Sequence, residues 1–245
     1  MVKVRFEKAE YEALKKFEKL HHQDIWTWII NKATEGIDTN KPLRILNITD
    51  EANIFALLLA EQMPTSKMIC AMRSEMPSSI DVPTNVTVVN YKTDEELISI
   101  GPVDVILISE LTNDVGDISE LFNRMRKLFD GAGKLIILAR PKNPPLPLPD
   151  VCLTLWRKLA LTREEISDAA KKTEFSFAGF TVSVPITVPK FDWEAILFSG
   201  TIPVVKNTPK CTEKVITDFC KARPANICFE EKLSMFLLKT SDISA

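Results

Sequence analysis

Glycine is scarce in this sequence, with 7 residues in 245, and the stretch after the first apolar strand contains none. The residues from Thr49 to Ile54 read Thr-Asp-Glu-Ala-Asn-Ile. A turn that cradles a nucleotide phosphate needs positions without a Cβ atom, because the backbone must approach the ligand closely. The absence of Gly-x-Gly-x-x-Gly therefore argues against a Rossmann-type oxidoreductase.

Histidine is scarcer still, since the only two, His21 and His22, are adjacent. Adjacent helical residues point in different directions, so this pair is a poor metal clamp. None of the five cysteines forms a Cys-x-x-Cys pair or lies at a zinc-type spacing from a histidine. No Gly-x-Ser-x-Gly elbow is present. We therefore predict free thiols, no metal site and no nucleophilic triad.

The charges show no excess of one sign, with 31 basic and 33 acidic residues spread along the chain. Such a balance gives no electrostatic footprint for nucleic acid or an anionic membrane. No uninterrupted apolar run reaches the roughly 20 residues of a membrane span, and the stretch from Met1 to Lys19 is too charged for a signal peptide. We expect a cytoplasmic protein without nucleic-acid or membrane partners.

Short apolar runs alternate with helical stretches after residue 42. Near-continuous apolar runs of this length are typical of strands covered on both faces of a parallel sheet. Five such runs cover residues 43–48, 68–72, 86–90, 103–109 and 135–139. Helical spacing predicts crossover helices over residues 53–62, 94–100 and 118–129.

The second half of the chain follows a proline-rich loop at residues 142–149. A helix is predicted over residues 153–170, strands over residues 175–184 and 232–239, and an apolar helix within residues 192–221. Taken together, these elements predict an α/β, Rossmann-like fold. Its sheet is mostly parallel and seven-stranded, with helices on both faces and an antiparallel C-terminal strand.

The chain before the sheet has a different pattern. Apolar residues recur at spacings of three to five between Glu7 and Lys32, which predicts one or two amphipathic helices. The pattern changes after Gly36 and Pro42. We expect an N-terminal helical segment, residues 1–41, and an α/β domain, residues 42–245.

One segment carries a resemblance to a known family. The twelve residues from Lys127 to Leu138 read Lys-Leu-Phe-Asp-Gly-Ala-Gly-Lys-Leu-Ile-Ile-Leu. They resemble the helix end, Lys-Pro-Gly-Gly turn and fifth strand of class I S-adenosylmethionine-dependent methyltransferases. The neighbouring strands fall in that family's order, so the resemblance spans about residues 42–239. The layout of the tail resembles the small-molecule amine N-methyltransferases of the histamine or phosphoethanolamine type.

This resemblance implies S-adenosylmethionine as the cofactor, yet the family's cofactor positions are replaced. Asn47 stands where an acidic residue is usual, and residues 50–53 replace the Gly-x-Gly turn. Arg73 stands in place of the acid that binds the ribose, and Tyr91 lies where a turn approaches the adenine. One interpretation is a rebuilt pocket formed by Asn47, Asp50, Asn53, Arg73 and Tyr91.

The alternative interpretation of these positions is structural. Asp50 or a neighbour caps the helix that follows, as Asp commonly does, and Tyr91 belongs to the core or its rim. Arg73 has the wrong charge for a ribose and suits an anionic group instead.

The end of the fourth strand is the best candidate for a substrate site. It reads Ser-Glu-Leu-Thr-Asn-Asp over residues 109–114, and ligands of open α/β sheets bind at this edge. Glu110 or Asp114 could hold a substrate ammonium, and Asn113 could orient it. A polar loop without a function is the alternative. No catalytic residue is named, because methyl transfer from a sulfonium to an amine needs mainly positioning and a neutral amine.

Two functional hypotheses follow. The first is a degenerate methyltransferase-like domain, or pseudoenzyme, that binds S-adenosylmethionine weakly or not at all. It would serve a structural, regulatory or partner-binding role, and its partner would be a protein or a second methyltransferase domain. The alternative is an active S-adenosylmethionine-dependent N-methyltransferase of a small amine.

Overall fold

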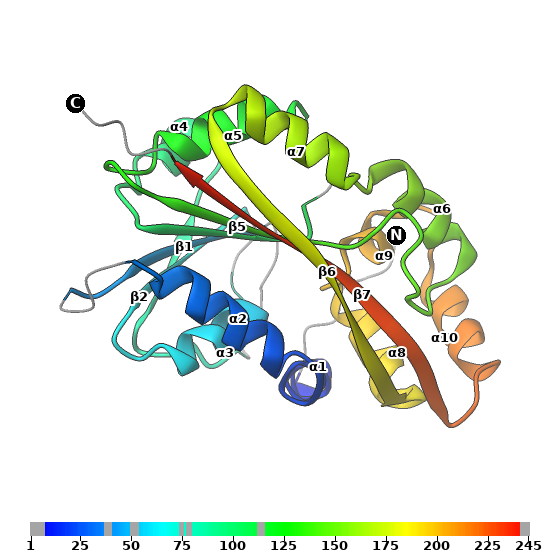
Figure 1. Cartoon of the computed structure of the whole chain (residues 1–245). Coiled ribbons are helices and arrows are strands. Elements are labelled where there is room, and N and C mark those ends of the chain that lie inside the picture. Colours follow the sequence, from blue (N-terminus) through cyan, green and yellow to red (C-terminus); the bar gives the residue numbers. More distant parts are fainter. Residues whose placement is uncertain are drawn as a thin grey trace.

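A computed structural model describes residues 8–36, 41–49, 54–73, 76, 80–111 and 116–240. The described strands form a seven-stranded sheet in the order β3-β2-β1-β4-β5-β7-β6 (Figure 1). The first five strands are parallel, whereas β7 is antiparallel to both β5 and β6. The strands are β1 Arg44–Thr49, β2 Lys67–Met72, β3 Val86–Asn90, β4 Val105–Ser109, β5 Lys134–Ala139, β6 Phe175–Pro189 and β7 Asn226–Thr240. The predicted fold class is confirmed.

Helices cover both faces of the sheet, which explains why the parallel strands are apolar almost throughout. Ile45 of β1 belongs to the core on one face, and its neighbour Leu46 belongs to the core on the other. One face is covered by α1 Lys8–His21, α2 Gln23–Thr34 and α3 Ile54–Gln62. The opposite face is covered by α4 Asp94–Ile98, α5 Ile118–Arg126 and α7 Arg163–Lys172 (Figure 1).

The N-terminal helices share the first of these cores. Tyr11, Leu14 and Phe17 of α1 and Ile25 and Ile29 of α2 are all buried in it. The two predicted amphipathic helices are therefore present. The division of the chain into residues 1–41 and 42–245 stays a prediction.

The helix predicted over residues 153–170 is wrong in one respect, because two helices occupy this stretch. The backbone is extended at Ala160, which separates α6 Asp150–Leu159 from α7. Thr162 then begins α7 with a capping box. Its hydroxyl accepts a hydrogen bond from the Glu165 backbone N–H, and the Glu165 carboxylate accepts one from the Thr162 N–H. This local hydrogen bonding competes with helix continuation.

The two last strands are longer than predicted. They pair without interruption from Phe175 opposite Thr240 to Pro189 opposite Asn226. Pro185 and Pro189 obscured this length in the sequence, since proline interrupts most strands. They are tolerated because β6 is an edge strand that need not donate to a further neighbour.

The far half of this long hairpin is covered by the segment that was hardest to interpret in the sequence. It contains α8 Lys190–Ser199, α9 Pro203–Asn207 and α10 Glu213–Lys221 (Figure 1). Helix α8 packs on α1, where the rings of Trp193 and Phe17 lie 6.0 Å apart. These helices form a wall beyond the carboxyl ends of the parallel strands. None of the described helices is both long and apolar enough to cross a membrane.

Candidate functional site

A cavity of about 540 Å³ lies at the carboxyl ends of the central parallel strands. Ile48 and Thr49 of β1 and Ile108 of β4 line its inner side, while Trp193 of α8 and Ile202, just before α9, line its outer wall. Ligands of open α/β sheets bind at this edge, and a cavity of this volume suits a small molecule. We take it as the candidate site.

One end of the cavity, here the cofactor end, is formed by the residues that follow β2 and β3. The guanidinium of Arg73 lies 5.3 Å from the centre of the Tyr91 ring, a cation–π distance. Tyr91 is buried and its backbone N–H donates to the Met72 carbonyl oxygen at 3.0 Å, whereas Arg73 is exposed. The structure therefore brings these two predicted positions together in the cavity wall.

Asn47 is not one of the residues that line the cavity. Asn47 is completely buried in β1, where it pairs with Cys70 of β2 on one side and with Leu107 of β4 on the other. Its side-chain oxygen and nitrogen have no hydrogen-bond partner among the described residues. A buried side-chain amide without hydrogen-bond partners destabilises the folded state. The packing around Asn47 therefore does not explain why this position is an asparagine.

Four other predicted site residues, Asp50, Asn53, Asn113 and Asp114, lie outside the described residues. Of the predicted substrate group, Glu110 is described, and it lines the cavity.

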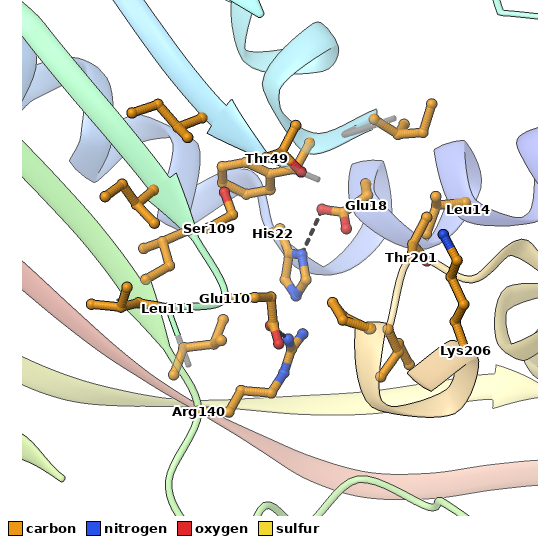
Figure 2. A pocket seen from close by; sticks show the side chains of 18 of the residues that line it. Leu14, Glu18, His22, Thr49, Ser109, Glu110, Leu111, Arg140, Thr201 and Lys206 are labelled. Carbon is orange, nitrogen blue, oxygen red and sulfur yellow. Dashed lines mark hydrogen bonds and ion pairs between the residues drawn. The ribbon is translucent and has the colours of Figure 1, made fainter. Parts of the chain in front are cut away.

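The opposite end of the cavity carries buried charges, and we call it the network end. His22, between α1 and α2, contacts one glutamate with each ring nitrogen. Its Nδ1 lies 2.6 Å from Oε2 of Glu18 (Figure 2). Its Nε2 lies 2.9 Å from Oε2 of Glu231. Burial alone would lower the pKa of His22, but Glu18 and Glu231 raise it to about 10. The ring is therefore protonated at neutral pH, and both nitrogens donate.

Glu231 extends this network to Arg140. The Nε of Arg140 donates to Oε1 of Glu231 at 2.8 Å, and a second guanidinium nitrogen contacts the same oxygen. Burial would raise the pKa of Glu231, whose side chain is 0% exposed, but Arg140 and His22 lower it to about 2. Glu231 thus carries a full negative charge between two cations.

Glu110 completes the network through an ion pair with Arg140 (Figure 2). Its backbone has a φ of 63°, the left-handed region that costs a residue with a Cβ about 1 kcal/mol or more. The N–H groups of Glu110 and Leu111 both donate to the carbonyl oxygen of Leu138 and hold this turn. Oε2 of Glu110 and the neighbouring Ser109 Oγ are buried without a hydrogen-bond partner among the described residues.

Of these residues, only Glu110 was predicted from the sequence as a site residue, and Glu18, His22, Arg140 and Glu231 were not. Arg140 had a usable signal, because it directly follows the buried strand β5 just as Glu110 follows β4. Glu231 had none, since it lies one residue before the strand that was predicted there. The sequence around His22 bears only on metal binding, because its neighbour is His21. Over the residues that are described, no three His, Cys, Asp or Glu side chains come together as metal ligands.

This chain is similar to known proteins in structure but not in sequence. No protein-family profile and no curated protein matches this sequence. Among solved structures, phosphoethanolamine N-methyltransferase 2 from Haemonchus contortus, in complex with phosphomonomethylethanolamine and S-adenosylhomocysteine, superposes with a TM-score of 0.56 at 15% identity. The match covers 89% of this chain and 53% of that one, so this chain spans about half of the relative.

Two further structures match over most of both chains. The YcgJ protein from Bacillus subtilis gives a TM-score of 0.55 at 14% identity, covering 89% of this chain and 99% of the other. Precorrin-6y C5,15-methyltransferase from Geobacter metallireducens gives 0.50 at 12% identity, covering 89% and 88%. The chain therefore has the Rossmann-like fold of the methyltransferases.

Proposed function

We propose that this chain is a degenerate methyltransferase-like protein that binds S-adenosylmethionine weakly or not at all and serves a regulatory or partner-binding role. The cation–π contact between Arg73 and Tyr91 at the cofactor end of the cavity carries this proposal. Ribose hydroxyls are held by an acceptor such as a carboxylate, and a guanidinium has no acceptor atom. The residues at this end do not fit the cofactor in the way that the family resemblance implies.

The end of β1 supports the same conclusion. The strand continues to Thr49, a residue with a branched side chain that lines the cavity. The sequence that follows has no glycine before Gly101. A cofactor at this edge would meet side chains where the family has bare backbone.

Calorimetric titration of the purified chain with S-adenosylmethionine and S-adenosylhomocysteine tests the proposal. We expect no binding tighter than about 1 mM, which corresponds to about −4 kcal/mol. Micromolar binding of either compound would overturn it. The variant Arg73→Asp makes the same titration a sharper test, because an aspartate restores a hydrogen-bond acceptor at this position. We expect this variant to bind either compound more tightly than the unmodified chain.

An active N-methyltransferase of a small amine is the second candidate. It is favoured by the size of the cavity and by the carboxylate of Glu110 inside it. The similarity to a phosphoethanolamine N-methyltransferase points the same way. Transfer of a labelled methyl group from S-adenosylmethionine to any member of a panel of small amines would establish this activity and exclude the degenerate role. In either case, we propose a cytoplasmic protein.

A further inference from the structure

Strand β6 forms one edge of the sheet, where β7 is the only described strand that pairs with it (Figure 1). Its 15 residues include no Asp, Glu, Lys or Arg, and they pair with β7 in one register without a bulge. Natural proteins protect the edge of a sheet from further pairing with charges, prolines or bulges. Among these devices β6 has only Pro185 and Pro189, which both lie toward its end. We call residues 175–185 the open half of β6.

The pairing with β7 determines which backbone groups of β6 face outward. Lys190, directly after the strand, donates its backbone N–H to the carbonyl oxygen of Ala225 at 2.9 Å. In an antiparallel pair such hydrogen bonds recur at every second residue, so the even-numbered residues of β6 bond to β7 and the odd-numbered ones face outward. Pro185 and Pro189 are both odd-numbered, as expected for residues without an N–H group. In the interior of the open half, the outward N–H groups belong to Phe177, Gly179, Thr181 and Ser183.

These outward groups are arranged symmetrically about Phe180, which makes the open half complementary to itself. When a second copy is related to the first by a two-fold axis at Phe180, Gly179 lies opposite Thr181 of the second copy. Phe177 then lies opposite Ser183 of the second copy. Each of these residues can both donate and accept, because directly opposed residues of antiparallel strands exchange both hydrogen bonds. We propose that two copies of this chain pair antiparallel through the open half of β6 and join their sheets into one.

The side chains that this pairing opposes are complementary as well. Phe180 lies opposite itself at a position without hydrogen bonds, where the side chains of antiparallel strands approach each other most closely. It is 39% exposed, and the ring of Trp28 from α2 packs edge-on against it with the ring centres 5.2 Å apart. On the same face of the sheet, Ala178 lies opposite Val182 of the second copy. Pairing therefore buries an exposed aromatic ring and opposes apolar residues, and such cross-strand pairs stabilise a sheet.

The distribution of charge is compatible with a second copy as the partner. The open half carries no charged side chain, so two copies oppose no like charges along the paired stretch. The nearest charged residues in the sequence, Glu174 and Lys190, lie outside this stretch, and Glu174 forms an ion pair with Arg126 at 2.7 Å. Contact of one patch with the same patch of a second copy gives a closed dimer, the commonest symmetry of soluble oligomers. The residues that line the cavity include none from β6, so the inference does not depend on the proposed function.

Sedimentation velocity of the purified chain, whose monomer has a mass of 27.6 kDa, tests the proposal. We expect a dimer at about 100 μM chain that dissociates on dilution. Thr181→Pro removes one outward N–H group from each copy and leaves the bonds to β7 in place, as Pro185 does in the native strand. We expect this variant to associate at least about tenfold more weakly than the unmodified chain.

Thr187→Pro is the matched control, because Thr187 also faces outward but lies beyond the open half. The two threonines have similar surroundings. Both are exposed, and each hydroxyl contacts a side chain of β7, Ser234 at 3.1 Å from Thr181 and the Cys228 sulfur at 3.6 Å from Thr187. We expect Thr187→Pro to form the dimer as the unmodified chain does.

A charge exchange at Phe180 tests the position of the two-fold axis. Phe180→Lys and Phe180→Glu each place like charges opposite one another, so each variant alone should be monomeric. An equal mixture of the two should form a dimer, because opposite charges then meet at the axis. A monomeric unmodified chain at about 100 μM would overturn the proposal. A dimer that Thr181→Pro leaves intact, or a mixture of the charge variants that does not associate, would overturn it as well. The charge exchange remains decisive if Thr181→Pro does not fold.

Discussion

The two ends of the cavity differ in how their charges are held. At the cofactor end Arg73 is exposed and stacks on Tyr91, so its charge remains in contact with water. At the network end Glu231 and His22 are buried, and each charge depends on its neighbours. Burying ions costs several kcal/mol unless each one is paired and hydrogen-bonded. The comparison teaches that Arg73 can carry its charge with little help from the fold, whereas each charge of the network depends on the other members.

Removal of Glu231 should have the largest effect. Glu231→Gln leaves His22 and Arg140 facing each other in the protein interior with a neutral group between them. Breaking a buried ion pair from one side typically costs about 3–5 kcal/mol, and we expect a loss of this size in the free energy of unfolding. Urea denaturation at pH 7 measures it.

The adjacent Glu230 provides the matched control. It lies on the same strand but is exposed, so Glu230→Gln should change the unfolding free energy very little. Equal losses in the two variants would show that Glu231 contributes no more than a surface charge. The contrast between the two ends of the cavity would then not hold.

The pH dependence of stability should reveal His22. Its pKa is about 10 in the folded chain against an ordinary value of 6.5, so its contribution is complete below about pH 6.5 and is lost as the pH rises toward 10. This predicts a loss on the order of a few kcal/mol between pH 7 and pH 9. The groups that face His22 are Glu18 and Glu231, with His21 beside it.

The variant His22→Gln tests this assignment. It should be less stable at pH 7 and should lose the alkaline decline, whereas His21→Gln should retain it. Urea denaturation at several pH values provides the measurement. An unchanged decline in His22→Gln would assign the pH dependence to another group.

The sequence was sufficient to predict the sheet because each parallel strand is a local apolar run. Such a run indicates a strand whose side chains are buried on both faces of the sheet. The end of β4 was also found, since Glu110 directly follows one of these runs. The network was not found, because its members lie at positions 18, 22, 110, 140 and 231 and meet only through the topology. Glu231 in particular is a charged residue in an alternating strand, a pattern that predicts exposure, and only His22 and Arg140 make its burial possible.

The backbone of Glu110 allows a smaller effect to be measured. At a φ of 63° a glycine is unstrained, whereas alanine keeps the strain of any residue with a Cβ. Glu110→Gly and Glu110→Ala both lose the ion pair with Arg140, so the difference between them isolates the backbone. We expect the glycine variant to be more stable by about 1 kcal/mol. If the alanine variant is equally stable, the turn is not strained.

The smallest effect is expected at the cofactor end. Arg73→Ala removes the guanidinium from the face of Tyr91, a contact that is worth about 0.5–1 kcal/mol at an exposed site. Arg73→Lys is the matched control, because it keeps a cation near the ring and should lose only part of this amount. Both values come from the same urea denaturation that measures Glu231→Gln. A loss in Arg73→Ala as large as that of Glu231→Gln would mean that Arg73 is a structural member of the fold. In that case the arginine at this position would reflect a requirement of folding, and it would no longer support the proposal of weak S-adenosylmethionine binding.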